Sequence, residues 1–278
     1  MTVGDLLRVA MSVLQPRPGL AQPGREARAM LACLLERDEA WVIAHPESGV
    51  ETRLAAVFER WLERRAGGEP FHHLVGACPF WGRVFAVGPA VLVPRPETEL
   101  VVSMTLGLGL PDTPRVLDVG TGSGCLAITL ALEIPGAVVT ATDASLAALA
   151  VARRNAVALG ARVALIAADL AAPLAGAFDL VVANLPYVPT GDIDTLAPEV
   201  RNHDPRPALD GGPDGLSLLR RFLPTLPDLL VPGAYALLEI GPGQAAALDR
   251  EGLPERLVKV GVERDLGGVE RALALRRV

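Results

Sequence analysis

A glycine-rich loop between an apolar strand and a helix is the feature that most constrains the fold of this chain. Residues 115–119 are mostly apolar, and the sequence runs Asp-Val-Gly-Thr-Gly-Ser-Gly from Asp118 to Gly124. Helical spacing of apolar residues follows over 125–132. Glycines allow a tight turn close to a ligand, and the free N–H groups at a helix start attract a negative group. The loop therefore predicts an α/β fold with a ligand site at this point.

Asp143 follows the next expected strand, about 20 residues beyond the loop, which is the usual place for an acid that accepts hydrogen bonds from ribose hydroxyls. Together, the loop and Asp143 predict a nucleoside cofactor. A dinucleotide site of the G-x-G-x-x-G type would place its third small residue at Cys125, whereas the glycine falls at Gly124. The spacing therefore favours S-adenosylmethionine over NAD.

Alternating strands and helices predict an α/β fold with a doubly wound, mostly parallel sheet. Ser145 can cap a helix that ends at Gly160, and another helix is expected near 216–230. The seven expected strands are 115–119, 137–142, 162–167, 178–183, 234–240, 256–262 and 270–277.

The first part of the chain has a different pattern. Apolar residues recur there at helical spacing, and Pro16–Gly19 and Pro23–Gly24 separate the first two stripes. We expect a small N-terminal helical bundle domain over residues 1–77. The three stripes cover residues 3–14, 27–35 and 54–62.

A β-hairpin and a stiff connector over residues 78–97 are expected to join the two parts. Gly82 lies near the turn of the hairpin, with aromatic residues on both sides. Two prolines bracket Arg95 and impose an extended backbone there. The sheet domain then covers residues 98–278.

A second motif, Asn-Leu-Pro-Tyr from Asn184 to Tyr187, directly follows the strand expected over 178–183. Open α/β sheets place their sites at the carboxyl ends of parallel strands. Pro186 fixes the backbone, so Asn184 and the Leu185 carbonyl can accept from the two N–H groups of a flat amide. The Tyr187 ring can stack on the amide plane. Because an amide nitrogen is a poor nucleophile, we interpret the motif as a catalytic site that works by alignment, although Asn-x-Pro also occurs as a plain turn.

Composition and charge argue against several other classes. The formal net charge is −6, without runs of like charge, which is not typical of nucleic-acid-binding proteins. No segment approaches the roughly 18 uninterrupted apolar residues of a membrane span, and the N-terminus lacks a secretory pattern. Cys33, Cys78 and Cys125 are far apart and predict neither a zinc site nor a disulfide framework. We therefore expect a cytoplasmic protein without a metal ion.

Taken together, these motifs resemble the release factor glutamine N5-methyltransferases, the HemK/PrmC family. The resemblance covers essentially the whole chain and implies a class I S-adenosylmethionine-dependent methyltransferase fold, which is Rossmann-like. The connector is its most specific part, because related ribosomal-protein and adenine methyltransferases differ there while sharing the Asn-x-Pro-aromatic motif. The matching segments are Phe80–Val87, Pro94–Glu99, Asp118–Gly124, Val200–Pro205 and Ala208–Leu216.

The resemblance implies transfer of a methyl group from S-adenosyl-L-methionine to the side-chain amide nitrogen (N5) of the glutamine in the Gly-Gly-Gln loop of peptide chain release factors. The product is S-adenosyl-L-homocysteine. The implied cofactor-binding residues are Gly120, Thr121, Gly122, Ser123, Gly124, Asp143, Asp169, Leu170 and Asn184. The implied substrate-binding residues are Asn184, Leu185, Pro186 and Tyr187, of which Asn184 and Tyr187 are catalytic. The helical domain would help to dock the release factor, and we expect a monomer that contacts neither nucleic acid nor membrane directly.

Two positions depart from the family pattern, since Leu185 stands where proline is usual and Leu170 where many members carry an aromatic residue. Two other functions also fit the motifs. One is methylation of an exocyclic base amine in DNA or RNA, against which the acidic charge argues. The other is a non-catalytic cofactor-binding scaffold, which would not need both Asn184 and Tyr187.

Overall fold

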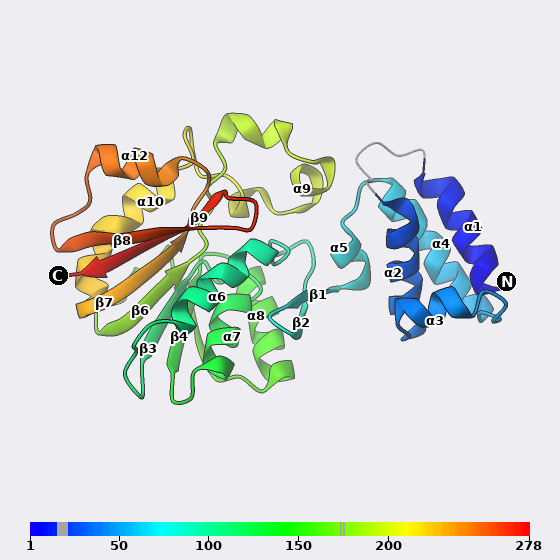
Figure 1. The fold of residues 1–278 in the computed structure, drawn as a ribbon, viewed down its shortest axis with the longest axis horizontal. Coiled ribbons are helices and arrows are strands. Elements are labelled where there is room, and N and C mark those ends of the chain that lie inside the picture. Colours follow the sequence, from blue (N-terminus) through cyan, green and yellow to red (C-terminus); the bar gives the residue numbers. More distant parts are fainter. Residues whose placement is uncertain (16–21, 173, 175) are drawn as a thin grey trace. The chain divides into compact units, whose positions relative to one another are not determined.

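The computed structural model describes residues 1–15, 22–172, 174 and 176–278, so the predicted break at Pro16–Gly19 lies outside the described residues. The chain forms two compact units (Figure 1). Within the described ranges, no helix has the length and apolar character needed to cross a membrane. The first unit comprises Met1–Ala77 and Thr195–His203, and the second comprises Cys78–Asp194 and Asp204–Val278.

The first unit is a bundle of helices, as the apolar stripes predict. Its first helix begins with a capping box, in which Thr2 Oγ1 accepts from the Asp5 N–H and the Asp5 carboxylate accepts from the Thr2 N–H. The stripe residues Leu6, Met30 and Phe58 are fully buried in the core of the bundle. The helices are α1 (Val3–Leu14), α2 (Pro23–Leu35), α3 (Glu39–Ala44), α4 (Thr52–Ala66), α5 (Phe71–Val75) and α9 (Pro198–His203).

A buried guanidinium links three segments of this unit. Arg65 of α4 is 6% exposed and forms ion pairs with Glu26 of α2 at 2.7 Å and with Glu199 of α9 at 2.9 Å. It also donates to the Glu69 carbonyl at 3.1 Å. A buried cation is tolerated only when it is paired, so these contacts hold α9 in the helical unit despite its distance along the chain.

The predicted hairpin lies near the start of the second unit. β1 (Ala77–Phe80) and β2 (Arg83–Ala86) are joined by Trp81 and Gly82, whose φ angles are 48° and 67°. Two consecutive residues with positive φ form the tight turn that suits the twist of paired strands. The Trp81 N–H donates to Glu99 Oε1 at 2.7 Å, which ties the turn to the segment that follows the connector.

The connector leads into the first helix of the sheet domain. Arg95 is extended, with φ −99° and ψ 143°, as its flanking prolines predict. A 3₁₀ turn, η1 (Pro96–Thr98), continues directly into α6 (Glu99–Leu106). Thr98 is buried at this junction.

A seven-stranded sheet, in the order β5-β4-β3-β6-β7-β9-β8, forms the centre of the second unit. Neighbouring strands from β5 to β7 are parallel, whereas β9 runs antiparallel to both β7 and β8. The predicted doubly wound, mostly parallel sheet is therefore confirmed. The strands are β3 (Arg115–Val119), β4 (Val138–Asp143), β5 (Val163–Ala167), β6 (Phe178–Ala183), β7 (Leu230–Glu239), β8 (Leu257–Arg264) and β9 (Glu270–Arg277).

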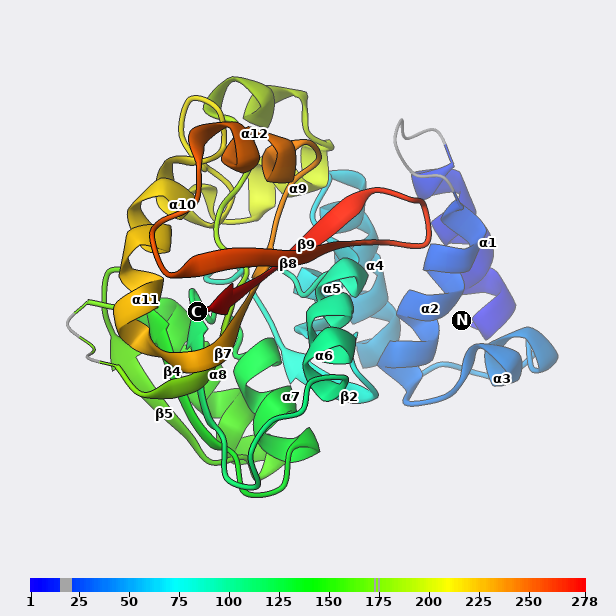
Figure 2. The same cartoon turned by 60° about the vertical axis from the view of Figure 1, so that its left-hand side comes forward.

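Helices cover both faces of this sheet (Figure 2). Successive residues of a strand point to opposite faces, so Val116 and Leu117 belong to different cores. Val116 packs in the core formed with α6, α7 and α8, and Leu117 in the core formed with α10, α11 and α12. Burial on both faces explains the near-continuous apolar sequences of the strands. The bounds are α7 (Cys125–Glu133), α8 (Leu146–Leu159), α10 (Ser217–Phe222), α11 (Leu226–Leu229) and α12 (Gln244–Glu251).

The segment before β7 differs from the sequence-based expectation. The helix expected near 216–230 is divided into α10, a 3₁₀ turn η4 (Leu223–Thr225) and α11. Pro224 and Pro227 each lie in the first turn of a new piece, where the missing N–H costs no hydrogen bond. β7 then begins at Leu230, earlier than the predicted start of this strand, and α12 was not among the expected helices.

Gly124, with φ 82°, lies at the start of α7, where an added Cβ would come within 2.8 Å of Ile128 Cδ1 and 3.2 Å of Ala152 Cβ. We expect Gly124→Ala to lower the free energy of unfolding by about 2–5 kcal/mol. About 1–2 kcal/mol comes from the left-handed backbone and about 1–3 kcal/mol from overpacking. Urea unfolding followed by circular dichroism measures the change.

Gly160→Ala is the matched control. Gly160 ends α8 with a similar φ of 71°, but no described atom lies within 4 Å of the added Cβ. Only the backbone cost of about 1–2 kcal/mol therefore applies. Equal losses in the two variants would contradict the close packing inferred at Gly124.

Candidate functional site

The two predicted loops meet at the centre of the sheet. β3 pairs with β6 in parallel, with Val119 opposite Ala183 at their carboxyl ends. β4 and β5 extend to one side of β3, and β7 lies on the far side of β6, so the strand order reverses here. Ligands of open α/β sheets bind beyond the strand ends at such a reversal. The loops that follow β3 and β6 line a common cavity of about 260 Å³.

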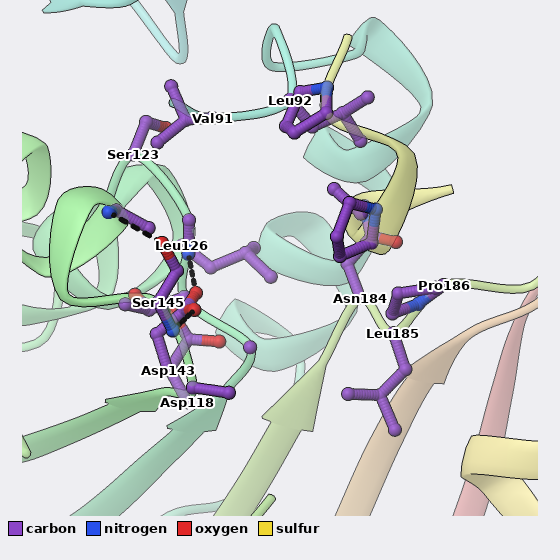
Figure 3. A pocket seen from close by; sticks show the side chains of 18 of the residues that line it. Val91, Leu92, Asp118, Ser123, Leu126, Asp143, Ser145, Asn184, Leu185 and Pro186 are labelled. Carbon is purple, nitrogen blue, oxygen red and sulfur yellow. Dashed lines mark hydrogen bonds between the residues drawn. The ribbon is translucent and has the colours of Figure 1, made fainter. Parts of the chain in front are cut away.

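Most of the predicted site residues line this cavity. Figure 3 shows Ser123 and Asp143 on one side of it and Asn184 on the other. Gly124 and Tyr187 are not part of its lining, as far as the structure describes the chain. The predicted residues in the lining are Gly120, Thr121, Gly122, Ser123, Asp143, Asp169, Leu170, Asn184, Leu185 and Pro186.

Backbone hydrogen bonds give the glycine loop its shape. The N–H groups of Gly120 and Thr121 both donate to the Thr142 carbonyl at 2.9 Å, which links the loop to the end of β4. Gly120 and Gly122 have φ angles of 75° and 56°, a region that glycine reaches without steric cost. A Cβ on Gly120 would lie 3.2 Å from Leu185 Cδ2. Glycine at this position therefore allows the two loops to approach each other closely.

Asp143 braces the glycine loop in addition to facing the cavity. Its Oδ2 accepts from the Gly122 N–H at 2.9 Å, and its Oδ1 accepts from the Ser145 N–H at 2.8 Å. Each carboxylate oxygen has a second lone pair, so Asp143 can still accept hydrogen bonds from the hydroxyls of a ligand.

Asp118 is a buried acid beside the cavity, with 1% of its surface exposed. Its Oδ2 accepts from the Thr121 hydroxyl at 2.6 Å and from the Ala127 N–H at 3.2 Å. In the described part of the chain, its Oδ1 has no hydrogen-bond partner. Burial, and to a smaller extent the charge of Asp143, raises the pKa of Asp118 to about 7. An unpaired buried acceptor is costly, so Oδ1 is a candidate contact for a donor on a ligand.

Asn155 of α8 joins the glycine loop to the hairpin. Its Oδ1 accepts from the Ala86 N–H at 2.8 Å, and its Nδ2 donates to the carbonyls of Ala86 at 2.9 Å and Ser123 at 2.8 Å. The side chain is buried, and these three bonds offset the cost of its burial.

Side chains anchor the Asn-Leu-Pro-Tyr loop. Asn184 Nδ2 donates to Thr98 Oγ1 at 3.2 Å, and the Leu185 side chain is buried in the core. The Tyr187 hydroxyl donates to Glu239 Oε1 at 3.2 Å, and Thr98 Oγ1 donates to Glu239 Oε2 at 2.7 Å. Burial is the largest cause that raises the pKa of Tyr187 and of Glu239. One buried carboxylate therefore connects both ends of the loop.

Gln244 of α12 supports the backbone of Tyr187. Its Nε2 donates to the carbonyls of Tyr187 at 3.1 Å and Gly215 at 3.0 Å, and its Oε1 accepts from the Gly241 N–H at 2.9 Å. A Cβ on Gly215 would lie 2.2 Å from the Tyr187 carbonyl oxygen, so the loop after the motif can pack this closely only because residue 215 is glycine.

Asp169 and Leu170 follow β5 at the edge of the cavity. The Asp169 side chain is 65% exposed and forms an ion pair with Arg221 at 2.6 Å. Leu170 has a φ of 55°, and its carbonyl accepts from Thr142 Oγ1 at 2.7 Å. The backbone of Leu170 is thus held at the end of β4 in a conformation that leucine rarely adopts.

The sequence-based reasoning did not identify four polar residues that shape the site: Thr98, Asn155, Glu239 and Gln244. Only Glu239 gave a signal in the sequence, as a charged residue within apolar Ala-Leu-Leu-Glu-Ile. A polar residue that is buried in this way has to find a partner, but the sequence does not say which one.

Comparisons with known proteins agree with this geometry. The family model described as "Methyltransferase small domain" matches residues 98–200, and "PrmC N-terminal domain" matches residues 5–76. The release factor glutamine methyltransferase of Deinococcus radiodurans is 42% identical over 281 residues, covering 100% of this chain and 99% of that protein. That of Cereibacter sphaeroides is 40% identical over 280 residues, covering 99% of each. The chain belongs to the release factor glutamine methyltransferase family.

The predicted family resemblance is therefore confirmed. Among solved structures, a methyltransferase from Pyrococcus furiosus matches with a TM-score of 0.54 and 19% identity, covering 71% of this chain and 90% of that one. This likeness concerns the fold, and with the methyltransferase family model it confirms the predicted class I methyltransferase architecture.

Asp118 predicts a dependence of stability on pH. In the folded protein this acid keeps its proton up to about pH 7, whereas an unfolded chain loses it near pH 4. Between these values the folded state binds more protons, so the contribution of this group to the free energy of unfolding falls as pH rises. We expect the wild type to lose up to about 4 kcal/mol relative to the Asp118→Asn variant between pH 4 and pH 7.

Urea unfolding of both proteins, without cofactor, at several pH values measures this difference. Asparagine is a matched replacement because its oxygen can still accept from Thr121 and Ala127. A difference in stability that does not change with pH would show that Asp118 ionises normally.

Proposed function

We propose that this protein transfers a methyl group from S-adenosyl-L-methionine to the N5 side-chain amide of the glutamine in the Gly-Gly-Gln loop of a peptide chain release factor. The observation that carries the proposal is the position of the glycine loop and the Asn-Leu-Pro-Tyr loop on opposite sides of one cavity. The first loop suits a cofactor with an amino-acid part and a ribose, and the second suits a flat amide. Relatives named release factor glutamine methyltransferase match almost the whole chain, which supports both assignments.

The residues on the glycine-loop side fit S-adenosyl-L-methionine. The open Oδ1 of Asp118 suits an ammonium donor, and the carboxylate of Asp143 suits ribose hydroxyls. The N–H groups at the start of α7 suit the carboxylate of the cofactor. We assign cofactor binding to Gly120, Thr121, Gly122, Ser123, Gly124, Asp143, Asp169, Leu170 and Asn184, with Asp169 and Leu170 at the adenine.

The residues on the other side fit a glutamine amide. Asn184 Oδ1 and the Leu185 carbonyl would accept from its two N–H groups, with Pro186 fixing the loop and the Tyr187 ring against the amide plane. The hydroxyl of Tyr187, held by Glu239, limits how far this ring can turn.

The bound cofactor supplies a methyl group on a positively charged sulfur. The amide nitrogen has a delocalised lone pair, so the main contribution of Asn184 and Leu185 is to align this nitrogen with the methyl group. In the transfer, the methyl group would leave this sulfur as it bonds to the amide nitrogen, one amide proton would pass to water, and S-adenosyl-L-homocysteine would be the product. No strong base is required on the protein.

The remaining assignments concern the partner. We assign the helical unit to docking of the release factor, in keeping with its match to the PrmC N-terminal domain. The net charge of −6 argues against direct binding of nucleic acid. We propose that the protein acts as a monomer in the cytoplasm.

The first test of this function is incubation of the purified protein with methyl-labelled cofactor and separated release factor, ribosome and tRNA fractions. We expect label in the release factor alone. The matched control is a release factor in which the Gly-Gly-Gln glutamine is replaced by glutamate. A carboxylate has no N–H for the two acceptors and would be repelled by them, so we expect at least a ~100-fold loss of labelling.

Two outcomes would count against the proposal. Label only in the RNA-containing fractions would favour a base methyltransferase. Equal labelling of the glutamine and glutamate forms would move the target to another position in the release factor.

Asn184→Ala tests the proposed acceptor. The variant would leave one substrate N–H unpaired and let the amide rotate away from the methyl group, so we expect turnover to fall ~100-fold or more. Single-turnover methylation of a release factor measures the rate. Cofactor affinity, measured by calorimetry on the same sample, separates the two roles assigned to Asn184. It should fall much less than turnover, because eight other residues are also assigned to the cofactor. A variant that methylates at the wild-type rate would reduce the motif to a structural turn.

A further inference from the structure

A chain of hydrogen bonds runs from the end of β7 to the cavity. It begins at the Glu239 carboxylate, which is 1% exposed and accepts from Thr98 Oγ1 at 2.7 Å. Thr98 Oγ1 in turn accepts from Asn184 Nδ2 at 3.2 Å, and Asn184 lines the cavity. The second oxygen of Glu239 accepts from the Tyr187 hydroxyl at 3.2 Å. The Asn184 amide is therefore held by residues that precede α6 and end β7.

We propose that Glu239 and Thr98 are positioning residues that orient the Asn184 amide, so that its oxygen rather than its nitrogen faces the substrate. The inference deepens the proposed glutamine methylation and rests on it. It also assigns the preference for a substrate with an NH₂ group to two residues that act through Asn184. Of these, Thr98 also lines the cavity.

The number of available protons fixes the direction of each hydrogen bond from Glu239 to Asn184. An ionised carboxylate can only accept hydrogen bonds, so Thr98 has to use its single hydroxyl proton to donate to Glu239. The Thr98 oxygen then has only lone pairs to offer, and its partner must be a donor. The Asn184 amide has one donating end, Nδ2, which is the end that faces Thr98. Its accepting end, Oδ1, is left for a ligand.

The reversed amide is disfavoured by the same arrangement. Turning the Asn184 amide around would place Oδ1 against the Thr98 oxygen, whose proton is already donated to Glu239. Two lone pairs would then face each other in a buried place, which costs the lost hydrogen bond and adds repulsion. The amide would also present N–H groups to the cavity, where they would suit a carboxylate or a carbonyl better than an NH₂ group.

The carboxylate is well fixed for this role. β7 pairs with β6 on one side and with β9 on the other, so Glu239 lies on an interior strand of the sheet. Burial raises the pKa of Glu239, whereas the hydroxyls of Thr98 and Tyr187 and the charge of Arg271 lower it and Glu97 raises it slightly. Burial is the largest of these causes, and the two hydroxyl donors act against it because each donates to one oxygen of the carboxylate. Tyr187, bound to the second oxygen, fixes the carboxylate against rotation.

The test compares Thr98→Val with Thr98→Ser. Valine keeps the shape of threonine and removes the hydroxyl, whereas serine keeps the hydroxyl and removes a methyl group. We expect the valine variant to lose about tenfold or more in the single-turnover rate, with the KM for release factor and the cofactor affinity changed less than about threefold. The serine variant should recover most of the rate. Wild-type turnover in the valine variant, or an equal loss in both variants, would overturn the inference.

A double-mutant cycle separates positioning from a general structural effect. If Thr98 acts through Asn184, then Thr98→Val should cost less than about twofold in an Asn184→Ala background. Independent, multiplicative losses would overturn the inference. Melting temperatures of all variants show whether they fold, and Glu239→Met provides a second route if the valine variant does not. Methionine has a similar volume but no oxygen to accept from Thr98, so the Thr98 hydroxyl is free to donate to Asn184 Oδ1 and the reversed amide is no longer disfavoured. Turnover should therefore fall again, and an unchanged rate in a folded Glu239→Met variant would overturn the inference.

The wild-type protein in the same assay distinguishes this inference from the proposed function. If it binds cofactor but labels no release factor, the proposed function fails and the inference falls with it. If it labels the release factor and Thr98→Val does so equally fast, the proposed function stands and only the role of Thr98 and Glu239 is overturned.

Discussion

The parallel pairing of β3 with β6 is the contact on which the second unit depends. These strands are separated in the sequence by two further strands and two helices, yet they lie side by side with Val119 opposite Ala183. Each is buried on both faces, which fixes the pairing through packing. A slip by two residues would keep the same side chains inward but shift one loop by about 6–7 Å relative to the other. Methyl transfer requires reacting atoms about 3 Å apart, so the pairing register has to be unique.

Buried polar side chains fix the positions of the loops that the pairing of β3 with β6 brings together. Asn155 joins the hairpin to the glycine loop, Gln244 joins the motif to the following loop, and Glu239 joins the motif to the connector. Each makes at least two hydrogen bonds to segments far away in the sequence. Such fully bonded groups contribute little net stability, but they penalise every arrangement in which a partner is displaced. The loops of the site are therefore held by contacts with specific geometry in addition to apolar packing.

Much of the fold and part of the site could be predicted from the sequence, because both rest on local patterns. The helix from Ser145 to Gly160 carries its own cap residues, and the glycine loop carries its own turn. The contact between Thr98 and Glu239 could not be predicted, since it joins residues 141 positions apart and depends on how α6 packs against β7. For the same reason, the sequence could not predict that Tyr187 is absent from the described cavity lining. Its hydroxyl donates to Glu239, which is also distant in the sequence.

The position of β9 between β7 and β8 has a consequence for how the sheet is completed. β9 follows both neighbours in the chain, so β7 pairs on one side only until residues 270–277 have joined it. During that interval the ten residues of β7, most of them apolar, expose a row of free N–H and C=O groups. A long apolar edge of this kind is a template for pairing with other chains, and hence for aggregation. The last strand of the sheet thus covers an edge of β7 that could otherwise pair with other chains. We expect a chain that is cut before residue 270 to aggregate, even though its glycine loop would still be present.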